Sequence, residues 1–210
     1  MKLTLVCISD THTKHDYIKV PDGDILVHAG DCSFTGTIAA IASFNTWLGT
    51  LPHKHKIVIA GNHDWLFQTD PALATSLLTN ATYLQDSGVE IEGFKFWGSP
   101  VSPEFNAWAF NRKRGKEINR HWKMIPMGTD VLITHGPPHG ILDQTAHKQS
   151  VGCRNLGNRV FVVRPQFHIF GHIHEGYGMR CANGTTFINA SSVNALYIPT
   201  NAPIVVDLEK

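Results

Sequence analysis

The chain has 210 residues, of which 42% are hydrophobic and 17% charged, and its formal net charge is +1. This composition excludes an intrinsically disordered chain and predicts a single domain over residues 1–210. A net charge near zero excludes bulk nucleic-acid binding through a global field. The N-terminal apolar stretch, residues 3–8, is too short for a signal peptide or a membrane span, so we expect a cytoplasmic protein that does not engage a membrane.

Short apolar runs alternate with helical patterns along the chain. The runs are rich in Val and Ile, which is typical of buried strands, and they lie at residues 3–8, 24–29, 57–60, 131–134 and 167–170. Apolar residues at spacings of three and four predict helices over residues 38–51, 118–125 and 153–163, and another helix begins at Asp70-Pro71. Thr37 and Asp70 are expected to cap the first of these helices and the one at Pro71.

Two further stretches, residues 81–98 and 184–208, show a strand, turn, strand pattern. The turn signals are Asp86-Ser87-Gly88 and Asn183-Gly184. Parallel units with crossover helices, combined with antiparallel hairpins, predict an α/β fold in which two mixed sheets pack face to face with helices outside. The expected architecture is therefore a four-layer αββα sandwich.

Polar side chains follow five of the predicted strands directly. The chain has 13 histidines, nearly as many as its 17 acidic residues, and many of them lie at these positions. Because ligand sites in open α/β sheets gather outside the carboxyl ends of the strands, we expect these side chains to converge on one site. They are Asp10 and His12 after the first strand, Asp31 after the second, Asn62, His63 and Asp64 after the third, and later His135, His172 and His174.

The set is suited to binding metal ions. Apart from His63 and Asp64, it comprises two Asp, one Asn and four His with no Cys, ligands that suit Mn, Fe or Zn. Seven ligands are too many for one tetrahedral ion, whereas two clusters that share a carboxylate match a two-metal hydrolase. Each motif alone would fit a capped turn or a buried polar group equally well. Five of them in order, each closing a predicted buried strand, favour the metal site.

Other histidines are assigned no chemistry. His53 and His55 alternate with lysines and predict a solvated loop, whereas His28 and His168 lie inside predicted strands and are expected to pack there.

The ordered motifs resemble the calcineurin-like metallophosphoesterase superfamily. Longer stretches are similar to its metallophosphoesterase domain-containing (MPPED) branch: VHAGD at 27–31, FNTWLG at 44–49, IVIAGNH at 57–63, THGPP at 134–138, HEGYG at 174–178 and INAS at 188–191. The resemblance implies the αββα sandwich, here without a separate cap domain, and two divalent transition-metal ions. Manganese is the preferred ion, with Fe, Zn, Ni and Co as alternatives.

The resemblance also implies which residues hold each ion. One ion would be bound by Asp10, His12, Asp31 and His174, and the other by Asp31, Asn62, His135 and His172, with Asp31 bridging the two. Some MPPED relatives carry glycine at the position of His172. The complete set in this chain implies an active hydrolase.

The expected mechanism is in-line attack on a phosphoryl group by a hydroxide that bridges the two ions. His63 would act as general acid or as a cation that stabilises the leaving oxygen, and Asp64 would orient its ring.

Substrate selection is expected to depend on the loop at residues 100–116. Phe105 and Trp108 would stack a base and Arg112 would steer a phosphate, although a packed aromatic loop with a solvated basic turn explains the same residues. The resemblance favours a phosphodiesterase for cyclic nucleotides or other small phosphodiesters. One alternative is a phosphomonoesterase. The other is a non-catalytic metal-binding scaffold, like the retromer subunit that has a similar domain, and His63 and the complete ligand set count against it. The oligomeric state stays open.

Overall fold

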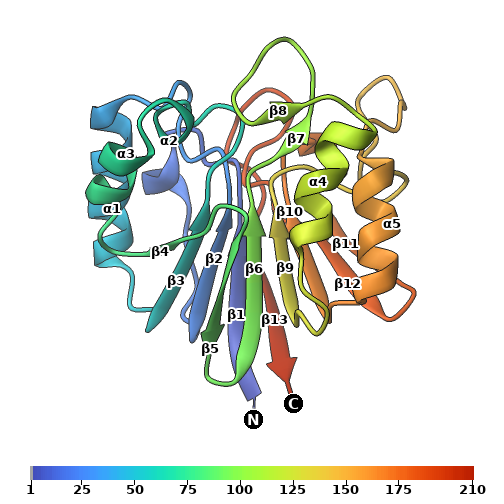
Figure 1. Cartoon of the computed structure of the whole chain (residues 1–210). Coiled ribbons are helices and arrows are strands. Elements are labelled where there is room, and N and C mark those ends of the chain that lie inside the picture. The colour runs from blue at the N-terminus through green and yellow to red at the C-terminus, as the bar shows by residue number, and fades with distance from the viewer. Residues whose placement is uncertain (1) are drawn as a thin grey trace.

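The computed structural model describes residues 2–210 as two β-sheets stacked between two layers of helices (Figure 1). The strands of the first sheet are, in spatial order, β13 (Ile204–Glu209), β1 (Lys2–Ile8), β2 (Ile25–Ala29), β3 (His55–Ile59) and β4 (Thr82–Tyr83). The second sheet has the order β11 (Gly178–Ala182), β12 (Thr185–Asn189), β10 (Phe167–Phe170), β9 (Val131–Thr134), β6 (Phe94–Ser99) and β5 (Ser87–Ile91). Both sheets have a parallel centre, and β13, β11 and β5 are antiparallel strands at the edges.

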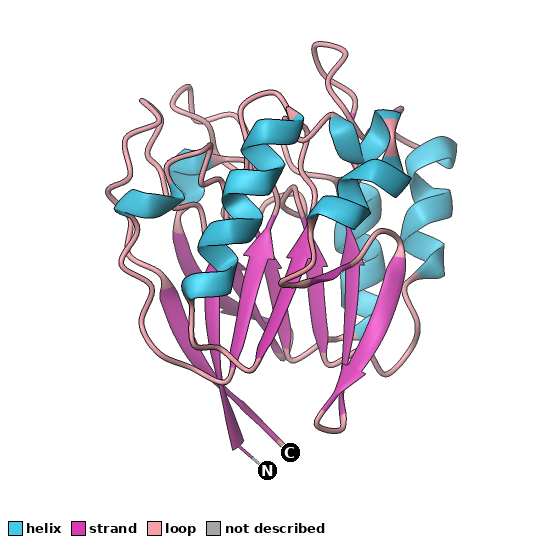
Figure 2. Ribbon diagram, turned by 90° about the vertical axis from the view of Figure 1, so that its left-hand side faces the viewer, coloured by secondary structure: helices cyan, strands magenta, loops and turns pink. Residues whose placement is uncertain are grey.

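The helices cover the outer faces of the two sheets, as Figure 1 and the rotated view in Figure 2 show. The first sheet carries α1 (Ile38–Thr50), α2 (Leu66–Thr69) and α3 (Pro71–Leu77), and the second carries α4 (Lys116–Met124) and α5 (Arg154–Val163). Two short strands, β7 (Ser102–Pro103) and β8 (Asn111–Arg112), pair with each other, and the turns η1 (His15–Tyr17) and η2 (His174–Gly176) are 3₁₀-helical. The predicted αββα sandwich is confirmed.

The core explains why the strands appear in the sequence as continuous apolar runs. In β1, Leu5 and Cys7 pack between the two sheets, whereas Val6 and Ile8 pack against α1. Successive side chains of a strand point to opposite faces, and here both faces are covered. A third cluster fills the space between the second sheet and its helices, with Trp122 fully buried at its centre.

The two predicted helix caps are confirmed. The Thr37 side chain accepts a hydrogen bond from the Ala40 N–H at 3.2 Å, and the Asp70 side chain accepts one from the Leu73 N–H at 3.1 Å. Each cap satisfies an N–H group that the first turn of a helix leaves unpaired.

Two local predictions are wrong. Ser87 and Gly88 begin β5, and the turn of this hairpin is instead Glu92-Gly93, with φ of +49° and +76°. Two residues of positive φ match the twist of paired strands, which is also the geometry of the correctly predicted Asn183-Gly184 turn. His53, expected in a solvated loop, is only 3% exposed because it lies beside the segment around Pro21 that leads into β2.

The carboxyl ends of the parallel strands of both sheets meet at one edge, at the top of Figure 1, while the two chain ends lie at the opposite edge. A β-bridge between Ser9 and Ser191 joins the ends of β1 and β12 there. The loops that carry the predicted ligands are therefore neighbours. Within residues 2–210, no helix combines the length and apolarity needed to cross a membrane.

His168, in β10, is a fully buried histidine away from this edge. Its Nε2–H donates to the Thr134 hydroxyl at 2.9 Å, since that hydroxyl itself donates to the Gly136 carbonyl at 2.8 Å. The Nδ1 atom has no hydrogen-bond partner. Burial lowers the pKa of His168 from 6.5 to about 3, so the ring stays neutral in the folded protein at ordinary pH.

We expect His168 to make the protein acid-sensitive. Below pH 6.5 the unfolded chain binds a proton that the folded chain does not, so stability falls progressively as the pH drops toward 3, by about 2 kcal/mol at pH 5. His168→Gln keeps an N–H donor for the Thr134 hydroxyl and removes the part of the acid-induced loss of stability that is due to His168. Urea unfolding between pH 7 and pH 4.5 should give a shallower decline for this variant than for the parent or for the control His147→Gln on the surface. Parallel declines for all three proteins would contradict the assignment.

Candidate metal centre

The seven predicted ligands come together at the edge where the two sheets meet. They lie in the loops that follow β1, β2, β3, β9 and β10, and all but His172 and His174 are at most 2% exposed. The tertiary structure therefore brings together residues as distant in the chain as Asp10 and His174, as the sequence predicts.

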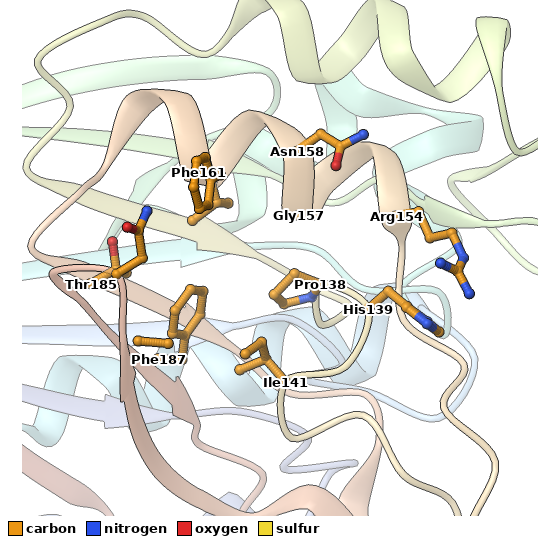
Figure 3. Close-up of a pocket in the computed structure, with 12 residues that line it drawn as sticks. Pro138, His139, Ile141, Arg154, Gly157, Asn158, Phe161, Thr185 and Phe187 are labelled. Atoms are coloured by element: carbon orange, nitrogen blue, oxygen red, sulfur yellow. The ribbon is translucent and has the colours of Figure 1, made fainter.

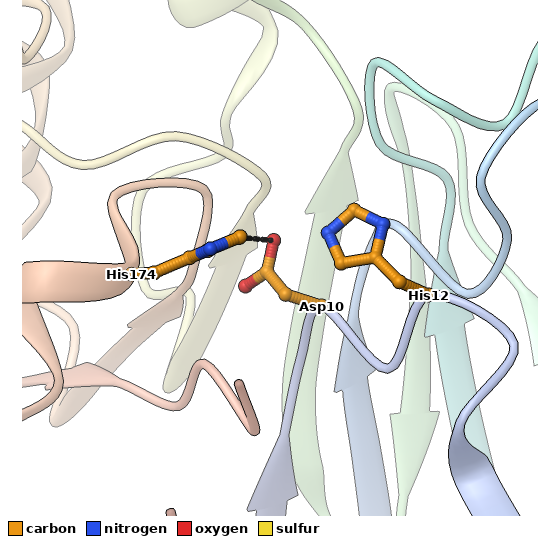
Figure 4. Close-up of side chains that lie close together, drawn as sticks. All are labelled: Asp10, His12 and His174. Carbon is orange, nitrogen blue, oxygen red and sulfur yellow. Dashed lines mark ion pairs between the residues drawn. The ribbon is translucent and has the colours of Figure 1, made fainter. Parts of the chain in front are cut away.

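Asp10, His12 and His174 form one group, with Asp10 between the two rings (Figure 4). Their potential ligand atoms lie within 4.8 Å of one another, and His174 Nε2 is 3.6 Å from Asp10 Oδ1. His12 Nδ1–H donates to the Ser33 carbonyl and His174 Nδ1–H donates to the Asn194 carbonyl, at 3.3 and 3.2 Å. These bonds leave Nε2 of each ring available. His12 Nε2 is buried without a hydrogen-bond partner, which fits a cation at this position.

Asp31, His135 and His172 form a second group of the same size. His135 Nε2 lies 3.2 Å from Asp31 Oδ2 and 2.9 Å from Asn62 Oδ1, so Asn62 belongs with this group. His135 Nδ1–H donates to the Ala29 carbonyl at 3.0 Å. The electron pairs of Nε2, Asp31 Oδ2 and Asn62 Oδ1 consequently converge, and either a proton on Nε2 or a divalent cation satisfies them.

The Asp31 carboxylate lies between the two groups. Its Oδ2 is 3.9 Å from His12 Nε2 on one side and 3.2 Å from His135 Nε2 on the other. Its Oδ1 accepts the His63 N–H at 2.8 Å. Asp31 also forms a group with His12 and His63, so this carboxylate contacts both halves of the site.

The charges of the site suit divalent cations. Burial alone would raise the pKa of Asp10 and Asp31, but the neighbouring rings of His174 and His135 outweigh it and hold both below their usual value. Burial lowers the pKa of His12 to about 4 and that of His172 to about 3, so both rings are neutral with free electron pairs. Burial also acts to lower the pKa of His135, but Asp31 raises it to about 9.

The backbone is strained at four of the candidate ligands. Asp10, His12, Asp31 and His172 have φ between +42° and +68°, in the left-handed region that costs non-glycine residues about 1 kcal/mol or more each. These conformations turn the side chains out of the strand direction and into the site. Neighbouring glycines allow the close approach: a Cβ on Gly61 would lie 2.2 Å from Asp31 Oδ1, and one on Gly171 would lie 2.0 Å from Asp10 Oδ2.

The predicted role of Asp64 is wrong. His63 Nδ1–H donates to the Phe34 carbonyl at 2.8 Å, so this carbonyl orients the ring. The buried Asp64 carboxylate accepts N–H groups of Cys32, Ser33 and Gly61 at 2.9 to 3.2 Å. It joins the loops that follow β2 and β3 because their unpaired amides, rather than the His63 ring, are within its reach.

A cavity of about 510 Å³ opens beside both groups. Phe105 and Trp108, for which base stacking is predicted, both line it. The Phe105 ring lies 5.0 Å from the His172 ring and the Trp108 ring 4.3 Å from the His63 ring. Arg112 does not line it, because its guanidinium turns back to the Asn111 carbonyl. The cavity is bounded by Asp31, Asn62, His63, Pro103, Glu104, Phe105, Asn106, Trp108, Arg114, Gly136, Pro137, Thr145, Val151, Gly152, His172, Ile173, His174 and Tyr197.

Two aromatic residues at the site carry no signal in the sequence. The Tyr197 ring lies 4.8 Å from the His12 ring and 5.0 Å from the His174 ring, and Phe34 stacks on His12 at 5.0 Å. Neither residue belongs to a strand end or a polar motif. Long-range packing alone places them beside the ligands.

The family model of the calcineurin-like phosphoesterase superfamily domain matches residues 1–209. The chain belongs to this superfamily. Human metallophosphoesterase domain-containing protein 1 is 46% identical to it over 228 residues, which cover 97% of this chain and 70% of that protein. UPF0046 protein K07C11.7 of Caenorhabditis elegans is 42% identical over 222 residues, which cover 99% of this chain and 76% of that protein. The predicted superfamily and branch are confirmed.

Solved structures share the fold. One crystal structure superposes with a TM-score of 0.71 at 18% identity, covering 90% of both chains. The crystal structure of TT1561 of Thermus thermophilus has a TM-score of 0.59 at 10% identity and covers 90% of this chain and 89% of that one. The superfamily suggests hydrolysis of phosphoester bonds and implies divalent metal ions, and the two groups described above are residues that could hold such ions.

Gly171→Ala should weaken metal binding at the Asp10 group. The added Cβ would lie 2.0 Å from Asp10 Oδ2, so the carboxylate must move. The matched control is Gly136→Ala, whose Cβ would meet its nearest neighbours, on His172 and Ser102, at an ordinary 3.8 Å. After dialysis against limiting Mn²⁺, elemental analysis should find about one ion fewer per chain in the first variant and no loss in the control. Equal metal content in parent and both variants would contradict the role of Asp10.

Proposed function

We propose that this chain is a dinuclear metal-dependent phosphodiesterase that hydrolyses cyclic nucleotides or other small phosphodiesters, with residues 1–210 working as one domain. The observation that carries the proposal is that two ligand groups meet at Asp31 and open, together with His63, onto one cavity.

Each ion would have four protein ligands. Asp10, His12, Asp31 and His174 would hold one, and Asp31, Asn62, His135 and His172 would hold the other, in agreement with the two groups and with Asp31 between them. Manganese is the ion that we propose from the family resemblance, and the imidazole, carboxylate and amide donors suit Mn, Fe and Zn alike. Two bound ions supply Lewis acidity, which provides hydroxide near neutral pH and neutralises charge on the phosphoryl oxygens.

His63 would act on the leaving group. Its Nδ1–H is held by the Phe34 carbonyl, and the Trp108 ring lies against one side of its imidazole. The ring therefore has a defined orientation with Nε2 free, beside Asp31 at the floor of the cavity. A proton held at Nε2 would be delivered to the departing oxygen.

The charges around the cavity favour a diester over a monoester. A monoester carries nearly two negative charges at neutral pH and a diester carries one. The one guanidinium among the lining residues, that of Arg114, already donates to the Val151 and Gly152 carbonyls at 2.7 and 2.9 Å. The lining also includes the exposed carboxylate of Glu104, which repels a second negative charge.

The aromatic side chains favour a substrate with a planar group. Phe105 and Trp108 reach the cavity from the loop between β7 and β8, whose base is held by hydrogen bonds of Ser102 and Glu104 N–H to the Phe110 and Arg112 carbonyls. A nucleoside base stacked on these rings would leave its phosphoryl group near the ligand groups.

His63→Ala should separate catalysis from metal binding. Both ions should be retained, because His63 is outside the proposed ligand set, while turnover of an alkyl phosphodiester should fall about 10² to 10⁴-fold. The loss should be smaller for bis(4-nitrophenyl) phosphate, whose leaving group needs little protonation. Steady-state kinetics on both substrates, with elemental analysis of the same samples, tests this. Equal losses on the two substrates would count against the acid role, and the absence of any diester hydrolysis by the metal-loaded parent would refute the proposed function.

Glu104→Gln should relax the preference for diesters. Removing one charge several ångströms from the substrate should raise kcat/KM for 4-nitrophenyl phosphate about threefold relative to bis(4-nitrophenyl) phosphate. The matched control is Glu90→Gln, which removes an exposed carboxylate on β5, outside the cavity lining. If the ratio of the kcat/KM values for the monoester and the diester is the same in all three proteins, Glu104 does not select substrates by charge.

A further inference from the structure

A second cavity, of about 470 Å³, lies on the outer side of the second sheet (Figure 3). It is bounded by α5, by the beginning of the loop that follows β9, and by the hairpin of β11 and β12, and it is open to solvent on one side. Its floor is apolar, with Pro138, Ile141, Val160 and Phe187, and Phe161 of α5 stands at its rim with 59% of its surface exposed. A concave, mostly apolar cavity of this volume has the size of a small-molecule site.

The ionisable side chains lie at one end of this cavity, and the uncharged Thr185 lies at the other (Figure 3). Arg154 and His139 lie side by side there, at the beginning of α5, as Figure 3 shows. No carboxylate lines the cavity, and within residues 2–210 Arg154 has no anionic partner. The nearby Asp143 faces His139 at 3.7 Å but already accepts the Gly140 and Gly152 N–H groups. An apolar floor with an uncompensated cation at one end complements an amphipathic anion.

The wall of this cavity is shared with the cavity of the metal centre. Pro138 and His139 line the second cavity, and Pro137, Val151 and Gly152 of the same loop line the first. The loop is tightly packed at this point, since a Cβ on Gly152 would lie 2.5 Å from the Pro138 carbonyl oxygen. A ligand that displaces Pro138 or His139 therefore also displaces Gly152.

We propose that this second cavity binds a small amphipathic monoanion, of the class of medium-chain carboxylic acids, and that its occupancy alters ligand binding at the metal centre. The carboxylate pairs with the Arg154 guanidinium, where the positive end of α5 adds to the attraction. The alkyl chain lies on Ile141, Val160 and Phe187. The first part of the proposal is independent of the function of the metal centre.

Gly157 is a position in the cavity wall from which a larger side chain can fill the cavity. It lies on α5 in the cavity wall, and a Cβ added to it would meet the Pro138 Cβ at 3.7 Å, an ordinary contact. Gly157→Ala is therefore a control that leaves most of the cavity open. Gly157→Leu extends a side chain into the space that the alkyl chain needs.

The binding test uses calorimetry with octanoate and the full-length, metal-loaded protein. Octanoate should bind the parent and Gly157→Ala alike, and at least tenfold more weakly to Gly157→Leu. Arg154→Gln should weaken the binding of octanoate about fivefold and leave the binding of octanol unchanged. Because a carboxylate could also bind the metal ions, undiminished binding to a folded Gly157→Leu, checked by its Tm, would overturn the assignment to this cavity. Should that variant not fold, equal affinity of parent and Arg154→Gln for octanoate would overturn the pairing with Arg154.

The coupling test uses inorganic phosphate as the probe of the metal centre. Saturating octanoate should change the Kd of phosphate at least twofold in the parent and in Gly157→Ala, but not in Gly157→Leu. An unchanged Kd in a parent that binds octanoate would overturn the coupling. Phosphate binding needs no turnover, so this result is independent of whether the enzyme prefers diesters.

Discussion

The burial of two carboxylates at the junction of two sheets is the constraint on which the rest of this structure depends. Asp10 and Asp31 are at most 2% exposed, and charged groups in such a position are costly unless opposite charges and hydrogen bonds compensate them. Asp31 accepts the His63 N–H and Asp10 accepts the His172 N–H, and imidazoles surround both. The left-handed backbone of the ligand residues and the adjacent glycines follow from the need to bring these groups so close together.

The four-layer architecture makes this concentration feasible. Parallel strands deliver their following loops to one edge of a sheet, and the packing of the sheets places two such edges together. The Ser9–Ser191 bridge and the hydrogen bond from the Ser192 N–H to the Ser9 carbonyl join the edges directly. The helices bury the outer faces of both sheets, so the loops with the candidate ligands lie at the edge of a packed core.

Buried aspartates away from the ligand groups organise the loops that shape the two cavities. The Asp64 carboxylate accepts hydrogen bonds from backbone N–H groups in the loops after β2 and β3. Asp143 accepts those of Gly140 and Gly152 within the loop after β9. Both satisfy backbone groups that lie outside regular structure. The Asp143 loop separates the metal centre from the second cavity, and its tight packing is the physical basis for communication between them.

The sequence by itself determined the five strands that precede the ligand loops, the caps at Thr37 and Asp70, and the candidate ligand set. Each depends on residues close together in the chain: apolar runs, a capping side chain three residues from its amide, and polar motifs at strand ends. Only the tertiary structure decided that Asp64 holds loops rather than His63, that His53 is buried, that Arg112 turns away from the cavity, and that Tyr197 and Phe34 pack beside the ligands. These outcomes depend on which distant segment is nearest in space. Hydrogen-bond partners and burial are set by that proximity, which local residue patterns do not encode.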